Sequence, residues 1–184
     1  MTRSLIRLSA MVLAIGVVAV NSFATQVIQQ TPKQLAQASQ LVVDGKVSSV
    51  RSYWNNDHSK IFTEAVVAVG STYKGGSTPS VRVVQIGGVV DNVRMTAAGA
   101  LQWKKGEEVL LFLEPSVPGA FQVAGFSQGK YLIERDARTG KAFVKQAMAP
   151  DSGNAKTLAS DAQPSAAPEK ITLQQFLDSV LPSE

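Results

Sequence analysis

The sequence predicts a mostly-β fold: one small β-barrel, closed or partly open, with a short capping helix before it and an amphipathic helix after it. Three observations favour this class. The run Val109–Leu113 is continuously apolar between Gly106-Glu107-Glu108 and Glu114, which is typical of a strand buried on both faces. Segments of alternating polarity flank this run, and glycine-containing turns separate them. We expect the barrel domain to span residues 25–147.

The first residues of the chain have the pattern of a secretory signal peptide. Arg3 and Arg7 are positively charged, Leu8–Val20 is apolar, and Asn21–Ala24 offers small residues at both cleavage-site positions. A membrane anchor, the alternative, needs about 20 apolar residues, and this run is shorter. We therefore expect residues 1–24 to be removed and the protein to be secreted, to the periplasm or the exterior, with no integral membrane segment left.

Composition excludes several classes of protein. Without the two arginines of the leader, the 18 basic residues become 16 against 14 acidic ones, a formal charge of +2. Such a balance does not indicate a nucleic-acid partner. The sequence contains no cysteine, which excludes a lipid-anchored lipoprotein, a disulfide scaffold, a cysteine nucleophile and a thiolate metal site.

The elements of the barrel can be placed from local signals. The capping helix is expected to begin at Thr31-Pro32-Lys33-Gln34 and to end near Ser39. Leu41–Trp54 is long for a strand, and its apolar parity switches after Ser48-Ser49, which predicts a bulge or bend that Gly45 eases. Such a strand can take part in two sides of a barrel. Further strands are expected at 61–73, 80–86, 89–95, 109–113, 121–125, 130–135 and 141–146, with hairpin loops at 126–129 and 136–140.

Composition changes after the last strand. Residues 148–170 are rich in Ala, Pro and Ser and are expected to form a flexible linker. Residues 171–184 are expected to hold a helix, because a second capping box is followed by an apolar stripe of Leu173, Phe176, Leu177, Val180 and Leu181. A helix this short is marginal alone in water, so it must dock. It either folds back on its own barrel or binds another protein.

Residues with catalytic or metal-binding chemistry do not form a convincing set. His58 is the only histidine and lies in a polar turn, where a solvated side chain is the simpler interpretation. Glu107 and Glu108 are neighbours, so in a strand they point to opposite faces, and we expect them to solubilise the mouth of a hairpin. Ser127 has a hydrolase-like spacing of glycines, but the sequence around it predicts strand followed by strand instead of strand followed by helix. We therefore predict no catalytic residue, no cofactor and no metal.

Aromatic residues near strand ends are the better candidates for contact with a partner, since aromatic side chains dominate many interfaces. Packing in the core is the alternative for most of them. The candidates are Tyr53, Trp54, Trp103 and Phe126 in the barrel and Phe176 in the terminal helix.

The order of motifs from residue 31 to residue 147 resembles a family of uncharacterised secreted bacterial proteins. The resemblance is carried by an ordered set of segments, of which no single one is specific, and it implies no particular activity. The segments are Leu41–Val47, Ile61–Glu64, Tyr73–Gly75, Ile86–Gly88, Gly106–Leu113 and Val123–Lys130.

A weaker similarity connects the chain with the OB-type barrel of netrin modules and tissue metalloproteinase inhibitors. Their first strand also reads Val-x-Gly-Lys-Val, as Val43–Val47 does, and their second ends in Lys-Gly, as Lys74-Gly75 does. The similarity implies an OB-like barrel. The inhibitors chelate the zinc of the protease through an amino-terminal cysteine, and that mechanism cannot transfer to a chain without cysteine.

These observations predict a secreted, non-enzymatic binding module with a protein partner, for which a secreted protease is one candidate. The alternative is a barrel that binds a small ligand or a carbohydrate through the aromatic residues around Trp54 and Trp103. The sequence does not indicate an oligomeric state.

Overall fold

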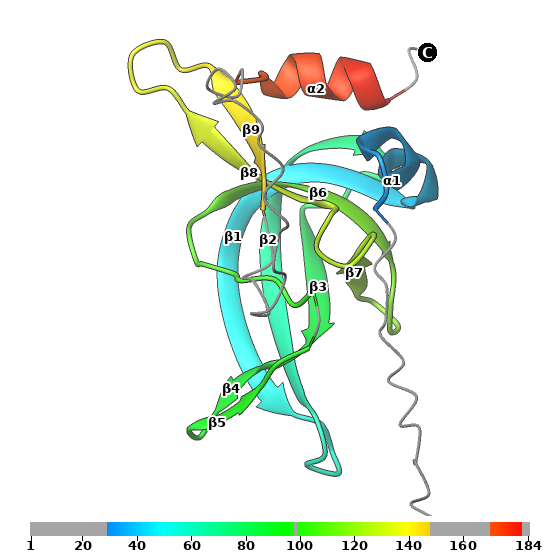
Figure 1. Cartoon of the computed structure of the whole chain (residues 1–184), viewed down its shortest axis with the longest axis vertical. Helices are drawn as coiled ribbons and strands as arrows, with labels where there is room; N and C mark the ends of the chain where they lie inside the picture. The colour runs from blue at the N-terminus through cyan, green and yellow to red at the C-terminus, as the bar shows by residue number, and fades with distance from the viewer. Residues whose placement is uncertain (1–28, 98, 148–169, 182–184) are drawn as a thin grey trace, which may run out of the picture.

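The computed structural model describes residues 29–97, 99–147 and 170–181 (Figure 1). The predicted signal peptide and, apart from Lys170, the predicted linker lie outside the described residues. Among the helices that the structure describes, none is long and apolar enough to cross a membrane.

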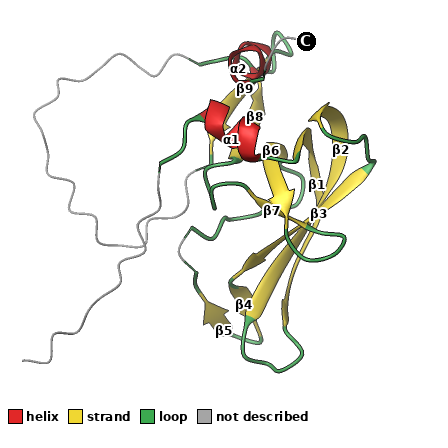
Figure 2. Ribbon diagram, turned by 90° about the vertical axis from the view of Figure 1, so that its right-hand side faces the viewer, coloured by secondary structure: helices red, strands yellow, loops and turns green. Residues whose placement is uncertain are grey.

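The described chain is mostly β, as predicted. The short helices α1 (Pro32–Ala38) and α2 (Leu173–Val180) lie close together at one end of the molecule (Figure 2). The strands between them are β1 (Leu41–Trp54), β2 (Ile61–Lys74), β3 (Ser80–Ile86), β4 (Gly88–Val90), β5 (Val93–Met95), β6 (Glu108–Pro115), β7 (Phe121–Val123), β8 (Lys130–Arg135) and β9 (Ala142–Gln146).

Five strands form a ring. The pairing order is β1-β2-β3-β7-β6, and β6 also pairs with β1, so the ring closes on itself. Its weakest joint is between β3 and β7, which run parallel and share the single residue pair Val83↔Phe121. Strands β8 and β9 extend the sheet beyond β6, and β4 and β5 form a separate hairpin at the end away from the helices (Figure 1). The ring is therefore not a clean barrel.

The long strand β1 bends as its sequence predicts. Its ladder with β2 shifts register at three places, including Asp44/Gly45 and Val47/Ser49. At Gly45 a side chain would collide with the carbonyl oxygen of Ala68, so this close approach of two strands requires glycine. The bend allows the first half of β1 to pair with both β2 and β6.

Strand β6 is the centre of the fold and is buried on both faces, which confirms the prediction from its apolar run. Because successive side chains of a strand alternate between faces, the run serves two cores. Leu110 and Phe112 face a cluster that includes both helices, whereas Val109, Leu111 and Leu113 face the inside of the ring. All five are fully buried.

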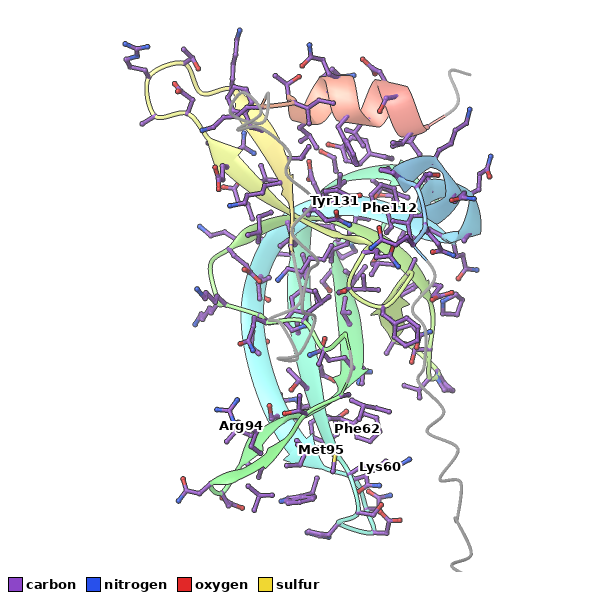
Figure 3. All side chains as sticks on the ribbon, in the orientation of Figure 1. Lys60, Phe62, Arg94, Met95, Phe112 and Tyr131 are labelled. Atoms are coloured by element: carbon purple, nitrogen blue, oxygen red, sulfur yellow. The ribbon has the colours of Figure 1, made fainter. Side chains whose placement is uncertain are left out.

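Helix α2 docks on its own domain. The ring of Phe176 lies 4.7 Å from that of Tyr131 and 6.3 Å from that of Phe112, measured between centroids. Figure 3 shows Phe112 and Tyr131 below α2 and beside α1. Just before the helix, the main-chain N–H of Val144 in β9 donates to the carbonyl of Ile171. This packing decides between the two alternatives for the terminal helix in favour of the barrel.

Burial of Tyr131 under α2 should make stability sensitive to alkaline pH. Desolvation raises the pKa of Tyr131 to about 12, above its ordinary value of 10.0. Because the pKa of Tyr131 is higher in the folded state, its protonated form contributes to stability. This contribution is complete below pH 10 and is lost as pH rises through 12. From pH 8 to pH 11 the free energy of unfolding of the wild type should fall, because Tyr131 ionises more readily in the unfolded chain. In Tyr131→Phe this fall should be smaller by about 1 kcal/mol, as measured by urea denaturation. An unchanged pH dependence would contradict this.

One predicted turn has a different role. Residues 126–129 were expected to join two paired strands, but β7 and β8 both pair with β6 and not with each other. The N–H of Phe112 donates to the carbonyl of Gly129, and the carbonyl of Phe112 accepts from the N–H of Ala124. Ala124 and Gly129 therefore both pair with the same residue of β6, and residues 125–128 form a bulged loop between them. The second predicted loop, 136–140, is a true hairpin between β8 and β9.

Candidate binding site at the open joint of the ring

The predicted contact residues lie in separate places. Tyr53 stacks on Phe62, and Trp54 stacks on His58, at the end of the molecule far from the helices. Figure 3 shows Phe62 at that end. Trp103 is half-buried, and its Nε1 donates to Gln85 Oε1 at 3.1 Å.

Phe176, also a predicted contact residue, is buried between Tyr131 and Phe112. Its ring belongs to the core that holds α2 in place and does not offer a surface to a partner. The apolar spacing of α2 predicted that one face of the helix would be buried, and this face packs against the β-strands of the same chain.

Phe126 remains as the most exposed of the predicted aromatic residues, with 59% of its surface accessible. Its φ is 62°, a left-handed conformation that is a true outlier for a bulky side chain. Such strain costs on the order of 1–3 kcal/mol and persists where surrounding structure or function requires it. The bulged loop 125–128 therefore holds an aromatic ring in solvent at an energetic cost.

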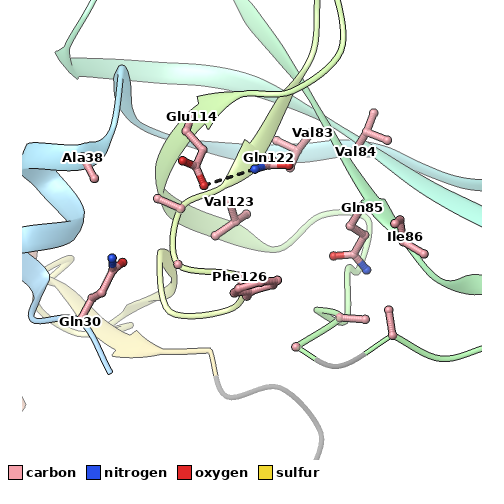
Figure 4. Close-up of a pocket in the computed structure, with 15 residues that line it drawn as sticks. Gln30, Ala38, Val83, Val84, Gln85, Ile86, Glu114, Gln122, Val123 and Phe126 are labelled. Carbon is pink, nitrogen blue, oxygen red and sulfur yellow. Dashed lines mark hydrogen bonds between the residues drawn. The ribbon is translucent and has the colours of Figure 1, made fainter. Parts of the chain in front are cut away.

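The side chain of Phe126 borders a pocket of about 410 Å³ at the weak joint between β3 and β7. Figure 4 shows Phe126 between Gln30 on one side and Gln85 on the other. The walls are mainly apolar, and most of their residues come from β3, β7, the bulged loop and the segment before Trp103. They include Val83, Val84, Ile86, Ala97, Ala100 and Val123.

The shape of the pocket follows from the glycine beside Phe126. Gly125 has a φ of 61°, and a side chain there would approach Gln30 Oε1 and Leu35 Cδ2 to 2.8 Å. The loop can therefore lie tightly against the segment that leads into α1. Gln30 N donates to Gln128 Oε1 at 2.8 Å, which joins this segment to the loop.

Polar groups in the pocket differ in how well they are satisfied. Both ends of the Gln85 side-chain amide are bonded, because Nε2 donates to Leu101 O at 2.8 Å and Oε1 accepts from Leu101 N. Gln122 Nε2 donates to Glu114 Oε1 at 3.3 Å (Figure 4). Gln30 Oε1 is buried and has no hydrogen-bond partner, which is unusual.

The two adjacent glutamates do not form a catalytic pair. Glu107 Oε1 accepts from Lys130 Nζ at 2.6 Å, and Glu108 Oε2 pairs with Arg135 at 2.7 Å. The expectation that both merely solubilise a hairpin mouth is wrong for Glu107, whose partner Lys130 is 1% exposed. Desolvation lowers the pKa of Lys130, and Glu107 partly restores it.

Lys130 is the residue that sequence reasoning missed. Its Nζ also donates to Gln102 O at 2.7 Å and lies 4.2 Å from the centroid of the Trp103 ring. Because Trp103 in turn bonds to Gln85, this buried cation supports one wall of the pocket. The position of Lys130 after Gly129 looks like a turn in the sequence, and no local signal marks it as buried.

Other ionic groups lie outside the pocket. Glu64 is buried on β2 between Arg51 and Arg82, and the hydrogen bond from Arg51 is the main reason that its pKa is lowered. Among the described residues, no group of three or more His, Cys, Asp or Glu side chains could hold a metal ion.

A second groove, of about 860 Å³, separates the helices from the end of β2. Its best-placed cation is already engaged, because Lys74 Nζ donates to Ala36 O at 2.7 Å and Gln37 O at 3.1 Å and so caps the end of α1. The groove also lacks an exposed aromatic residue among those that line it. The pocket beside Phe126 is the stronger candidate.

Comparison with protein-family models, with curated proteins and with solved structures finds no match to this chain.

Proposed function

We propose that this chain is a secreted, non-enzymatic protein-binding module with an OB-like barrel, and that its contact surface is the pocket beside Phe126. The observation that carries the proposal is an exposed aromatic ring, held in a strained conformation at the rim of an apolar pocket. Rigid aromatic residues beside desolvated pockets are the typical anchors of protein interfaces.

The OB-like assignment is supported by the ring itself. In chain order the ring consists of β1, β2, β3, β6 and β7. The first three pair antiparallel, β6 pairs with β1, and β7 runs parallel to β3. A five-stranded, partly open Greek-key barrel is the description of that fold. Secretion is supported by the amino-terminal pattern of Arg3, Arg7 and Leu8–Val20.

The test compares Phe126→Gly with Val117→Ala. Glycine relieves left-handed strain of about 1–2 kcal/mol and costs about 0.5–1 kcal/mol of chain entropy, so we expect stability to rise by about 0.5 kcal/mol. Val117 is an exposed apolar residue that does not line the pocket, so Val117→Ala serves as the matched control.

Each form would be cross-linked in the secreted fraction of the producing cells, and the attached proteins would be quantified by mass spectrometry. We expect a partner with the wild type and with Val117→Ala, and a loss of about 30-fold in affinity with Phe126→Gly, equivalent to about 2 kcal/mol. Recovery of no protein, or equal recovery with all three forms, would reject the proposal. The identity of the partner decides whether it is a protease.

A small ligand is the second candidate, favoured by a pocket volume of about 410 Å³. Small-molecule sites typically have about 300–1,000 Å³ and a few oriented polar groups. A thermal-shift screen with glycans and small metabolites separates the two functions. A ligand that stabilises the wild type but not Phe126→Gly would favour this second function.

A further inference from the structure

The outer edge of β3 is the feature that defines what the pocket can hold. Hydrogen bonds from Val69 N to Pro79 O and from Gly87 N to Ile61 O fix the phase of the ladder between β2 and β3. Bonded pairs alternate along an antiparallel ladder, so the odd-numbered residues of β3 direct their main-chain groups to β2. The even-numbered residues, including Ile86, direct theirs to the opposite edge.

That opposite edge is open beyond a single point. The pair Val83↔Phe121 is the one pairing of β3 with β7, and β7 itself ends at Val123. Within the described part of the chain, no main-chain hydrogen bond reaches Ile86 from this side. Unpaired strand edges are templates for another strand, and proteins normally cover, twist or charge them. Here Ile86 is instead apolar and 44% exposed.

The pocket adjoins this open edge directly. Val84 and Ile86 line it, and so does Phe126 from the bulged loop. Figure 4 places Gln30 across the pocket from Ile86. One wall therefore offers strand-type main-chain groups, and the middle offers apolar surface.

We propose that the partner enters as an extended peptide strand, which pairs with the outer edge of β3 at Ile86 and places one apolar side chain against Phe126. This inference rests on the proposed protein-binding function and deepens it. Strand addition gives affinity through main-chain hydrogen bonds and specificity through pockets for alternate side chains. A partner helix has no free main-chain groups to offer along its length, so it would leave the edge unpaired.

Amide hydrogen exchange of the free protein tests the open edge without a partner. In spectra of the mature chain, the amides of Gln85 and Gly87 should exchange slowly because they face β2, and that of Ile86 should exchange at least about tenfold faster. Strong protection of the Ile86 amide in the free protein would overturn the inference, because the edge would then be occupied.

Short random peptides, displayed and selected on the wild-type chain, then supply a probe. We expect apolar sequences of alternating pattern, and protection of the Ile86 amide should rise about tenfold or more in the complex while that of Gln85 stays unchanged. N-methylation at alternate peptide residues should abolish binding, since it removes the donors that face β3. Selection of no peptide would overturn the inference.

Two failures are distinguishable. Peptides that lose affinity with Phe126→Gly but bind equally well after N-methylation would reject strand addition and leave the proposed function intact. Peptides or proteins that bind Phe126→Gly, Val117→Ala and the wild type equally would reject the site itself.

Discussion

Replacement of Phe112 by alanine is expected to remove about 4 kcal/mol of the free energy of unfolding, because large-to-small changes of buried Phe cost about 3–5 kcal/mol. The side chain is fully buried, and its ring lies 5.8 Å from that of Tyr131 and 6.3 Å from that of Phe176. Loss of the ring would leave a cavity between the central strand β6 and helix α2. Two neighbours would lose aromatic contacts at the same time.

Urea denaturation followed by circular dichroism measures this effect. Phe112→Leu is the matched control, since it keeps an apolar side chain of similar reach and is expected to cost about 1–1.5 kcal/mol. A loss for Phe112→Ala no greater than that for Phe112→Leu would show that the core closes around the cavity. The central place of β6 in the fold would then be contradicted.

Local sequence patterns predicted the strands well where a strand's own residues decide its environment. The apolar run of β6, bounded by Gly106 and Glu114, needed no distant information. Nor did the parity switch after Ser48-Ser49, because an alternating pattern must break where the strand bends. β3 and β8 begin and end at the predicted residues, since clear turn residues flank them.

The candidate site was predicted only in part, because it is assembled from segments distant in the chain. Phe126 was identified by its type and its place near a strand end. Gln30 and Gln85 lie in unremarkable contexts, and their position at the pocket depends on the packing of α1 and on the bond to Leu101. The bulged loop looked like a hairpin because its sequence cannot show that both flanking strands pair with β6.

The open joint and the strained Phe126 lie next to each other in the chain. β7 pairs with β3 at its first residue, Phe121, and its remaining two residues do not pair with β3. The loop that follows β7 passes through two left-handed residues, Gly125 and Phe126. A chain selected only for stability would close the ring and place glycine at both positions. An open joint and an exposed Phe126 side chain are consistent with a contact surface.

The buried pair of Lys130 and Glu107 gives the second large effect, and the structure predicts an asymmetry between its members. Glu107→Gln would leave the ammonium group of a 1% exposed lysine without its anion, and we expect a loss of about 3–5 kcal/mol at pH 7. Lys130→Met should cost less, because the Glu107 side chain is 16% exposed and also accepts from Lys104 N at 3.1 Å.

The pH dependence separates this explanation from a simple packing defect. The folded pKa of Lys130 lies below its ordinary value of 10.5, so the unfolded chain binds more protons and stability rises with pH through this window. Glu107→Gln removes the group that raises the pKa of Lys130. The pKa of Lys130 in the folded protein then falls further, and stability increases more steeply with pH. We therefore expect Glu107→Gln to recover part of its lost stability between pH 7 and pH 9.5, and Lys130→Met to recover none. Equal pH profiles for the two variants, measured by urea denaturation, would show that charge burial at Lys130 does not govern their stability.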